Sequence, residues 1–491
     1  MTRRWFPFIL LLVAGLVATG CTVGPNYQRP ETPIPATYRG AEADAAAPVP
    51  PGTFADLGWW QLFGDPDLQA LIRQALAANY DLLVAVTRIL QAQAQLTAIG
   101  ADQYPRLDAQ ANAPYTGYVG GSRPETTSAQ NFAPAAGLTF GWELDLWGKF
   151  RRATEAAQAQ LLASQDVRDG VVISLVAQVS QAYFTLRSLD LDLEISKRTV
   201  VSRQQSRELV QARLDGGVAG ILDLQQAETL LYGATKTIPD IQRQIEQTEN
   251  FISILLGKNP GPIPRGRSLE QRLGPPALPP GLPVELLARR PDVRQAEQQL
   301  VAANAQIGVA KAQLYPQVGI SGFAGVTGFI TSGLNYGPLG VLNVLPFVNL
   351  PIFNAGGLLA GVDLAEAQTQ EAILRYQQTV QQAFREVADA LVEVRKRREF
   401  REQQVLLTKT LGDASEVARL RYEGGVSSYL EVLDTERQFF QAELDLTLAR
   451  RDELSAIVQL YKALGGGWQA EPAASSPAGG RAEGTKAATA P

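Results

Sequence analysis

Two stretches of the chain are predicted to form single, very long helices. From about residue 150 to 214 only the tolerable Gly170 interrupts a helical pattern, and apolar residues recur at spacings of three and four. These residues are Val171, Leu175, Val179, Ala182, Leu186, Leu189 and Leu193. A second such stretch runs from about 357 to 423. At 1.5 Å per residue each would be roughly 95 Å long, so it needs lateral helical partners at coiled-coil spacing rather than a compact core.

The long helices belong to an internal duplication. The segments RLDGGVAGILDLQQAE (213–228) and RYEGGVSSYLEVLDTE (421–436) match at Arg, Gly-Gly-Val, Leu and Glu. Further upstream, Tyr104-Pro105 pairs with Tyr315-Pro316. A repeat of about 208 residues is a duplicated domain rather than a solenoid unit, so the two halves share one plan.

Each half is predicted as helix, strand pair, very long helix, tight turn and long helix. In the first half, residues 66–103 are helical by pattern and end at Tyr104-Pro105, because a residue before proline leaves the α region. The segment LTFGWELDLW (138–147) then alternates apolar with polar residues, so one strand face is apolar and the other carries Glu143 and Asp145. The second half has weaker counterparts at 317–326 and 341–350.

The N-terminus resembles an export signal. Arg3 and Arg4 precede the apolar run FPFILLLVAGLVA (6–18), and small residues lead to Cys21. The block ATGC (18–21) resembles a bacterial lipobox, with Ala18 where Leu is commonest. We therefore expect a signal peptide over 1–20 and a lipid on the sulfur of Cys21. Thr22, rather than Asp, resembles the outer-membrane sorting pattern of bacterial lipoproteins.

Composition and pattern predict the organisation of the mature chain. Residues 21–57 are rich in Pro and Ala and suggest an extended, lipidated strap, and the tail over 466–491 is expected to be disordered. Between them we expect repeat 1 over 58–257, a linker over 258–281 and repeat 2 over 282–465.

The residue counts exclude several classes of function. The chain has no His, one Met and one Cys, so after Cys21 it lacks the side chains that most often ligate transition metals or act as nucleophile and base. A net charge of −5 gives no basic footprint for nucleic acid. Glu143 and Asp145 form a weak candidate for a catalytic carboxylate pair, because their repeat partners are Asn349 and Pro351. We expect no enzyme activity, cofactor or metal site.

The strands are the candidate membrane-spanning elements. An alternating strand of about ten residues can cross a bilayer when tilted, and four aromatic residues suit an interface belt: Tyr115, Tyr118, Trp142 and Trp147. One such strand alone would equally fit a soluble, half-buried sheet. The mature chain has no uninterrupted apolar run of 18 residues, so we expect no membrane-spanning helix. Four strands cannot close a barrel, so transmembrane strands would require oligomerisation around a wet lumen.

An ordered set of motifs resembles the TolC-type outer-membrane factors, and more closely their lipidated branch, which serves multidrug and metal efflux. The matching segments are CTVGPNYQRP (21–30), WWQLFGDPDL (59–68), GWELDLWGK (141–149), the Gly-Gly-Val turns and LARRPDVRQAEQQLVAANAQIGVAKAQLYP (287–316). The resemblance implies a mainly α protein with transmembrane β. Four strands per protomer would build a trimeric twelve-stranded barrel, continued by a twelve-helix α-barrel.

The resemblance also implies a location and partners. The protein would be a lipid-anchored homotrimer in the outer membrane that extends into the periplasm. Its partners would be a periplasmic adaptor (membrane fusion protein) and an inner-membrane transporter, commonly a proton-driven one of the resistance-nodulation-division type. The alternatives are a duct for type I polypeptide secretion and a periplasmic adaptor lipoprotein, although adaptors carry one hairpin and this chain has two.

In this family the helix turns are the tips that meet the adaptor. Here they are Gly216, Gly217 and Val218, and Gly424, Gly425 and Val426. Glycine at a helix end also makes such a turn for conformational reasons alone.

Just past the second turn, the family pattern places a gate. Leu430, Asp434 and Arg437 share one helical face, and three copies would stack an apolar ring on an acidic ring. By default the Asp434–Arg437 pair is only a weak surface salt bridge. The first repeat has Leu222, Gln226 and Thr229 there, so the second hairpin is expected to carry the gate.

Two further features stay open. Ser427 stands where the non-lipidated branch has an inter-helix arginine, which puts that lock in doubt. The basic run RKRREFR (395–401) is either an electrostatic contact or a solvated face.

Overall fold

The computed structural model describes most of the chain. The described residues are 22–39, 58, 60, 64–114, 130–132, 134–266, 269, 287–331 and 334–466. Cys21, Tyr115, Tyr118, the expected signal peptide and nearly all of the expected tail lie outside them. The chain divides into two compact units. The first holds residues 1–39, 80–171 and 282–388, and the second holds 40–79, 172–281 and 389–491.

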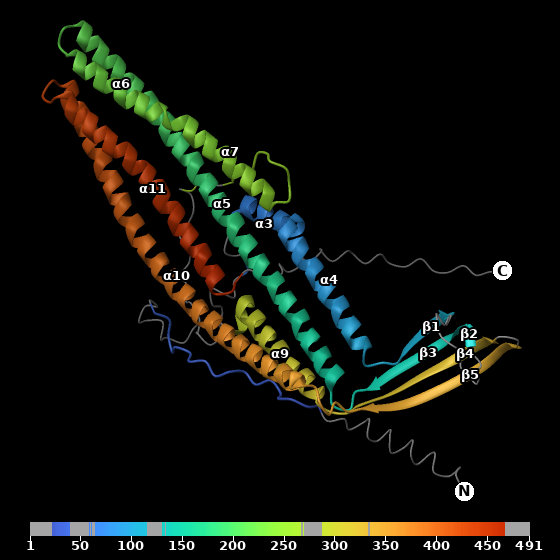
Figure 1. Cartoon of the computed structure of the whole chain (residues 1–491). Coiled ribbons are helices and arrows are strands. Elements are labelled where there is room, and N and C mark those ends of the chain that lie inside the picture. The colour runs from blue at the N-terminus through green and yellow to red at the C-terminus, as the bar shows by residue number, and fades with distance from the viewer. Residues whose placement is uncertain are drawn as a thin grey trace, which may run out of the picture. The chain divides into compact units, whose positions relative to one another are not determined.

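The first unit contains one antiparallel sheet (Figure 1). Its four longer strands are β1 (Arg106–Asn112), β3 (Ala135–Leu144), β4 (Gln317–Thr331) and β5 (Leu334–Asn349). They lie in the order β1-β3-β4-β5. A fifth, three-residue strand, β2 (Gln130–Phe132), pairs with the far end of β4 and was not expected from the sequence. Strands from both repeats therefore meet at the β3–β4 pair.

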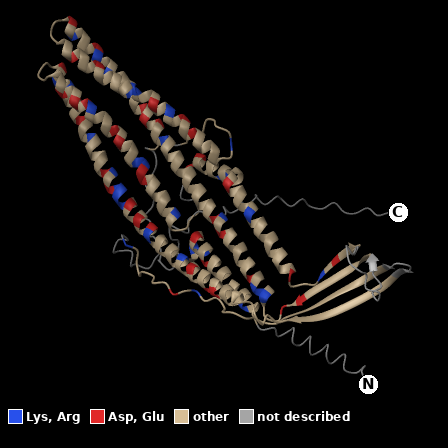
Figure 2. Ribbon diagram, in the orientation of Figure 1, with Lys and Arg blue, Asp and Glu red and all other residues tan. Residues whose placement is uncertain are grey.

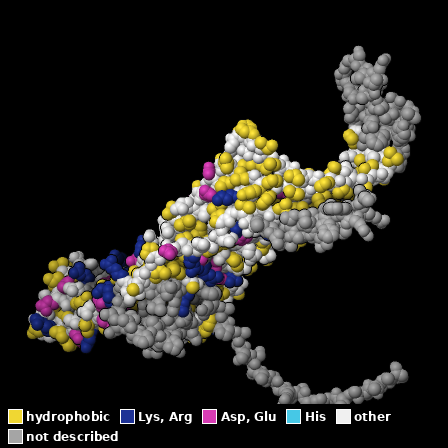
Figure 3. All heavy atoms as spheres, turned by 90° about the horizontal axis from the view of Figure 1, so that it is seen from below, with side chains coloured by type: hydrophobic (Ala, Val, Ile, Leu, Met, Phe, Trp, Pro, Cys, Tyr) yellow, Lys and Arg dark blue, Asp and Glu magenta, His cyan; other side chains and the backbone are white. Residues whose placement is uncertain are grey.

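The strand register gives the sheet two chemically different faces. Leu107, Phe140 and Val344 align across the sheet, and their neighbours on that face are almost all apolar. On the opposite face Asp108 and Thr139 align with Phe323 and Asn343, so this face is polar on β1 and mixed on β4 and β5, where Leu345 and Phe347 also lie on it. β4 and β5 contain no charged residue, and Figure 2 shows how few charges the strands carry compared with the helices. On the face drawn in Figure 3, hydrophobic side chains gather over the sheet and the adjoining helix ends.

Among the described residues, four helices belong wholly or partly to this unit. They are α4 (Tyr80–Ala101), α9 (Pro291–Ala312), the start of α5 (Lys149–Asp215) and the start of α10 (Gly357–Glu423). Ala156 and Ala159 of α5 pack on Ala302 and Ala305 of α9, since small side chains allow the helices to approach closely. An ion pair of 2.5 Å between Arg294 and Asp166 joins the same two helices.

The N-terminal segment over 22–39 follows an extended path along this unit. Val23 N donates to Trp147 O at 3.0 Å, and Asn304 Nδ2 donates to Pro25 O at 3.0 Å. Arg29 Nε and Nη2 both donate to the Glu297 carboxylate, at 2.7 and 2.5 Å. The segment is thus fastened by several separate contacts, although its residues form no helix or strand.

The second unit contains the hairpin ends of both long helices. It holds α3 (Pro66–Ala78), α6 (Ile221–Thr235), α7 (Thr237–Leu255), α11 (Tyr429–Ala463) and the remainders of α5 and α10. The first repeat breaks its return helix into α6 and α7, whereas α11 is continuous. Pro239 explains the break, because proline has no N–H for a helical bond to residue 235.

One described stretch satisfies the length and hydropathy criterion for a membrane span: Pro66–Ala101. The criterion averages hydropathy over 18 residues and tolerates occasional charges, so it is less strict than a search for an uninterrupted apolar run. The stretch is weak evidence for a span, because the helix ends at Ala78 and restarts at Tyr80. Its apolar side chains Leu83, Val84 and Leu90 are exposed in the single chain.

Candidate functional site

The two hairpin turns have matching backbone geometry. Gly217 has φ +74° and Gly425 has φ +73°, in the left-handed region that glycine adopts cheaply. Val218 N donates to Arg213 O at 2.9 Å, and Val426 N donates to Arg421 O at 3.0 Å. Both turns are therefore glycine-terminated helix ends of the same type.

The turns present apolar side chains to solvent. Val218 and Val426 are both exposed, and each is followed by an exposed leucine, Leu222 or Leu430. Gly216 and Gly424 each donate to the carbonyl four residues back, at 3.0 Å, and so close the last helical turn. The six tip residues predicted from the sequence thus lie at two equivalent helix ends.

Leu430, Asp434 and Arg437 share one exposed face of α11. Leu430 is 59% exposed, and Arg437 Nη2 lies 2.9 Å from Asp434 Oδ1. Gln438 Nε2 also donates to Asp434 Oδ2, at 2.6 Å. The acidic side chain is thereby held in place and open to solvent in the single chain.

The first hairpin has an equivalent exposed leucine but no charged residues at the positions of Asp434 and Arg437. Leu222 is 62% exposed, much like Leu430. Gln226 and Thr229 replace the acid and the base at the equivalent positions. The difference between the hairpins is therefore one of charge rather than of leucine exposure.

Arg213 joins the two hairpins, a role that the sequence interpretation did not anticipate. Its Nη1 donates to Tyr422 O at 3.0 Å, and its Nη2 donates to Glu423 O at 2.8 Å. The guanidinium also lies 4.4 Å from the centre of the Tyr422 ring. Ser427, where the non-lipidated branch has arginine, has a buried hydroxyl with no hydrogen-bond partner among the described residues.

An apolar cluster surrounds this contact. Tyr422 and Tyr429 pack with ring centres 5.2 Å apart, and Val210, Leu224 and Val432 are buried beside them. The hairpins are thus held together at their ends by apolar packing and by one arginine.

A partly open pocket lies further along the same hairpins. Its volume is about 240 Å³, and it is lined by α5, α10 and α11. Arg203 lies at its wall, with Nη1 donating to Leu230 O at 2.6 Å and two other nitrogens unpartnered among the described residues. Burial lowers the pKa of Arg203 and raises the pKa of Glu436 on the opposite helix. The space between the hairpins is therefore polar and incompletely bonded.

The basic run on α10 makes ion pairs to α11. Arg397 lies 3.0 Å from Asp452, and Arg401 lies 2.5 Å from Glu453, which is buried. Arg398 also approaches Glu453, at 3.5 Å. These arginines stabilise the second hairpin, so the run is a contact within the chain rather than a solvated face.

Glu143 and Asp145 have separate structural roles. Lys149 Nζ donates to both oxygens of Glu143, at 3.0 and 3.2 Å. Asp145 lies beyond the end of β3 and accepts from the backbone N–H groups of Phe150 and Arg151 at the start of α5. The expectation that Asp145 lies on the polar strand face is therefore wrong, because it caps the helix instead.

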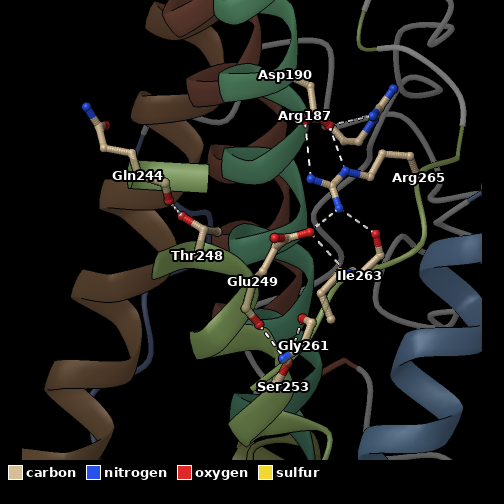
Figure 4. Close-up of polar contacts among 9 residues, drawn as sticks. All are labelled: Arg187, Asp190, Gln244, Thr248, Glu249, Ser253, Gly261, Ile263 and Arg265. Atoms are coloured by element: carbon tan, nitrogen blue, oxygen red, sulfur yellow. Dashed lines mark hydrogen bonds and ion pairs between the residues drawn. The ribbon is translucent and has the colours of Figure 1, made fainter. Parts of the chain in front are cut away.

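A network of ion pairs fastens the loop that follows α7 (Figure 4). Arg265 Nε lies 3.2 Å from Asp190 of α5, and its Nη1 contacts Glu249 of α7. Ile263 N donates to the same Glu249 carboxylate at 3.2 Å, and Ser253 Oγ donates to Gly261 O at 3.2 Å. This cluster holds a loop, and all of its carboxylates have partners, so it offers no free site.

The described residues contain no group of three or more His, Cys, Asp or Glu side chains placed to hold a metal ion. Cys21 lies outside them, and Thr22 is the first described residue, in contact with Gly148 at the end of the loop between β3 and α5. The described part of the N-terminal segment therefore begins at the base of the sheet.

A sequence profile of the family described as "Outer membrane efflux protein" matches residues 71–258 and 282–466. The chain is 34% identical over 466 residues to the cation efflux system protein CusC of Escherichia coli O6:H1, which covers 94% of this chain and 99% of that protein. It is also 34% identical over 473 residues to the toluene efflux pump outer membrane protein TtgC of Pseudomonas putida, covering 93% of this chain and 95% of the relative.

Solved structures of outer-membrane channels share the fold. The outer-membrane channel OprN matches with a TM-score of 0.80 and 33% identity, covering 91% of this chain and all of that one. The open state of the Neisseria gonorrhoeae channel MtrE also gives a TM-score of 0.80, with 32% identity over 91% of this chain and 99% of that one. The predicted fold class is confirmed.

Proposed function

The chain belongs to the outer membrane efflux protein family, and from this premise we propose that three copies form the exit duct of a tripartite efflux pump. The duct is an outer-membrane channel that conducts small molecules passively. An inner-membrane transporter, of the resistance-nodulation-division type, supplies the energy, and a periplasmic adaptor connects the two. The duct itself catalyses no reaction.

One observation carries this proposal: the sheet has one apolar face, an opposite face that carries its polar side chains, and two open edges. Within the described residues β1 pairs only with β3, and β5 pairs only with β4. An unpaired strand edge in lipid leaves each backbone polar group unsatisfied, at several kcal/mol per group. Three copies of the four longer strands close a twelve-stranded barrel and remove every edge, with the apolar face toward lipid and the polar face toward water.

The exposed apolar side chains of α4 support the same assembly. A water-soluble monomer rarely leaves a long row such as Leu83, Val84 and Leu90 uncovered. In a ring of three copies the neighbouring chain covers this row.

The second hairpin carries the gate of the duct. Three copies of Leu430 form an apolar ring, and three copies of Asp434 form an acidic ring beside it. The tips at Gly216, Gly217 and Val218, and at Gly424, Gly425 and Val426, contact the adaptor. Their exposed valines supply apolar area, and their glycines allow a close approach of backbone.

The cargo is a class of small molecules such as drugs or metal ions. The relatives include both a cation efflux protein and a toluene efflux protein. A wide, wet channel need not recognise its cargo, so the transporter sets the choice. A lipid on Cys21 anchors each protomer to the outer membrane.

Single-channel recording in planar bilayers tests the gate. We expect the double variant Leu430→Ala/Asp434→Ala to conduct several-fold more than the wild type and to sensitise cells to large antibiotics. Leu222→Ala/Gln226→Ala is the matched control, because it truncates the equivalent side chains of the first hairpin. Equal conductance of wild type and both variants would place the gate elsewhere, and a purified trimer that forms no channel would overturn the duct itself.

A further inference from the structure

The two junctions between a strand and a long helix follow one sequence plan. Leu146 and Trp147 lie between β3 and α5, and their repeat partners Ile352 and Phe353 lie between β5 and α10. The first junction ends in Gly148, with φ +78°, directly before α5. After its apolar pair the second junction is two residues longer, and it has positive φ at both Ala355 (+52°) and Gly356 (+84°) before α10. The duplicated junctions therefore share an apolar pair of side chains but differ in the turn that follows it.

At the first junction the aromatic residue is docked on the other repeat. Trp147 stacks on Tyr315, with ring centres 4.8 Å apart and planes 27° from parallel. Trp147 Nε1 donates to Pro316 O at 2.7 Å. This contact lies where β3 ends and its neighbour β4 begins.

At the second junction the equivalent residues are bare. Ile352 is 92% exposed and Phe353 is 89% exposed. Tyr104, the repeat partner of Tyr315, is 72% exposed, whereas Tyr315 is 39% exposed. The chain therefore contains both partners of an equivalent contact, Phe353 and Tyr104, but each is left exposed in the single chain.

The sheet order shows why they are unmatched. Phe353 follows β5 and Tyr104 precedes β1, and these two strands are opposite edges of the sheet. β5 ends, and β1 begins, at the same end of the sheet as the Trp147–Tyr315 stack, because neighbouring strands alternate in direction. Closing a ring of copies brings β5 of one chain beside β1 of the next with the same antiparallel geometry as β3 and β4.

We propose that Ile352 and Phe353 of each copy dock on Tyr104 of the next copy, as the inter-subunit counterpart of the Trp147–Tyr315 stack. The occupant of this apolar surface is thus a second copy of the same chain. This inference rests on the proposed trimer. The trimer alone requires only that the edge strands β5 and β1 of neighbouring copies pair. The internal repeat predicts which side chains come into contact there.

The repeat also sets the strand register between copies. In β3–β4, Trp142 pairs with Ile320. The repeat partners of these two residues are Val348 and Ala109. We therefore expect Val348 of one copy to lie opposite Ala109 of the next. A slip of one residue would move Val344 and Val348 of β5 from the face of Leu107 to the face of Asp108 on β1.

Cysteine cross-linking tests both contacts in the full-length, membrane-inserted protein. Tyr104→Cys/Phe353→Cys, treated with a short bismaleimide, should run as a covalent trimer on denaturing gels. Trp147→Cys/Tyr315→Cys is the matched control, since its cross-link forms within one chain and leaves a monomer band. Val348→Cys/Ala109→Cys should give an oxidised trimer, whereas Val348→Cys/Asp108→Cys, with side chains on opposite faces, should not. The parent chain, which retains Cys21, reports any background reaction.

The outcomes separate the inference from the duct proposal. If the protein is trimeric by sedimentation and 348/109 cross-links while 104/353 stays monomeric, the junction faces lipid and the docking inference is overturned. If Val348 cross-links to Asp108 rather than to Ala109, the register is overturned. If the native protein is monomeric in the membrane, the duct proposal fails together with this one.

A second measurement does not depend on cysteine. Phe353→Ala should lower the temperature at which trimers dissociate in mild detergent, and Phe353→Trp should restore it. Trimers of Phe353→Ala as heat-stable as the wild type would contradict the docking.

Discussion

At the scale of single residues, Arg213 forms a polar contact that, together with the apolar cluster around Tyr422 and Tyr429, holds the two hairpins together at their ends. Its guanidinium donates to two backbone carbonyls of α10, those of Tyr422 and Glu423, and lies over the Tyr422 ring. Among the described residues, the guanidinium of its repeat partner Arg421 makes a single ion pair, at 3.7 Å from Glu431. Equal positions in the repeat thus have unequal contacts.

We expect Arg213→Ala to loosen the second hairpin and to raise the open fraction of the channel. The loss of two hydrogen bonds from a charged donor costs on the order of 2 kcal/mol, enough to change an open–closed ratio more than tenfold. Single-channel open probability is the measurement. Arg421→Ala is the control and should leave the open probability within twofold. Equal effects of the two variants would contradict a specific role of Arg213 in holding the hairpins together.

Asp192 makes a prediction about pH. Burial raises the pKa of this carboxyl to about 7, although Thr447 and Arg451 oppose the shift. The unfolded chain has a pKa near 4 at this position, so the folded protein holds an extra proton between these values and loses stability as pH rises through them.

Asp192→Asn removes this titration. We expect the variant to be more stable than the wild type at pH 8, by on the order of 2 kcal/mol, with a smaller difference at pH 5. Thermal unfolding in detergent at both pH values measures it. A stability difference between the variant and the wild type that stays constant from pH 5 to pH 8 would show that Asp192 does not titrate in this range.

Residue roles were predictable only where they depended on local spacing. The glycine turns and the shared face of Leu430, Asp434 and Arg437 follow from helical periodicity. Arg213 could not be found this way, because its partners are backbone carbonyls about 210 positions away, and backbone acceptors leave no mark in a sequence. The capping role of Asp145 was missed because the strand pattern continued past the true strand end at Leu144.

At the scale of elements, the extended N-terminal segment depends on one close approach. Gly24 has φ +98° and lies against Gly308 of α9. A Cβ on Gly308 would lie 2.8 Å from Val23 O, nearer than atoms tolerate. Two glycines thus let the strap lie flat on the helix.

We expect Gly308→Val to displace the strap without unfolding α9. Hydrogen exchange over residues 22–39 should become markedly faster, while α9 stays protected. Gly170→Ala is the control, because a Cβ there meets nothing within 4 Å, and alanine favours a helix by about 1 kcal/mol over glycine. Unchanged protection of the strap in Gly308→Val would show that the contact is dispensable.

The elements were largely predictable, and their interruptions were not. The long helices end close to the predicted positions, at Asp215 and Glu423, because glycine pairs terminate them. The break between α6 and α7 at Pro239 was overlooked, since a helical pattern on both sides masked it. The lengths of β4 and β5 exceeded the prediction, because pairing between strands, rather than alternation alone, decides where a strand ends.

At the scale of the whole molecule, the duplication explains more than any single motif. The family profile matches the chain twice, once in each half. In the sheet, β3 of the first half pairs directly with β4 of the second half. A closed ring needs this contact between halves within each chain and the equivalent contact, β5 with β1, between chains. In the proposed trimer, neighbouring copies would cover both the open edges and the bare second junction.

The matched geometry of the two glycine turns has a consequence for stoichiometry. In the proposed trimer, three chains would present six turns with matching φ angles and hydrogen bonds. Their side chains would alternate between two kinds, with Asp434 present at every second position. A partner protein that recognises only the backbone of the turn would find six sites, so two copies of the partner would bind each chain. A binding protein that requires the carboxylate would count three. The duplicated chain therefore offers quasi-equivalent sites, and the ratio of bound partner to duct reports which property the partner reads.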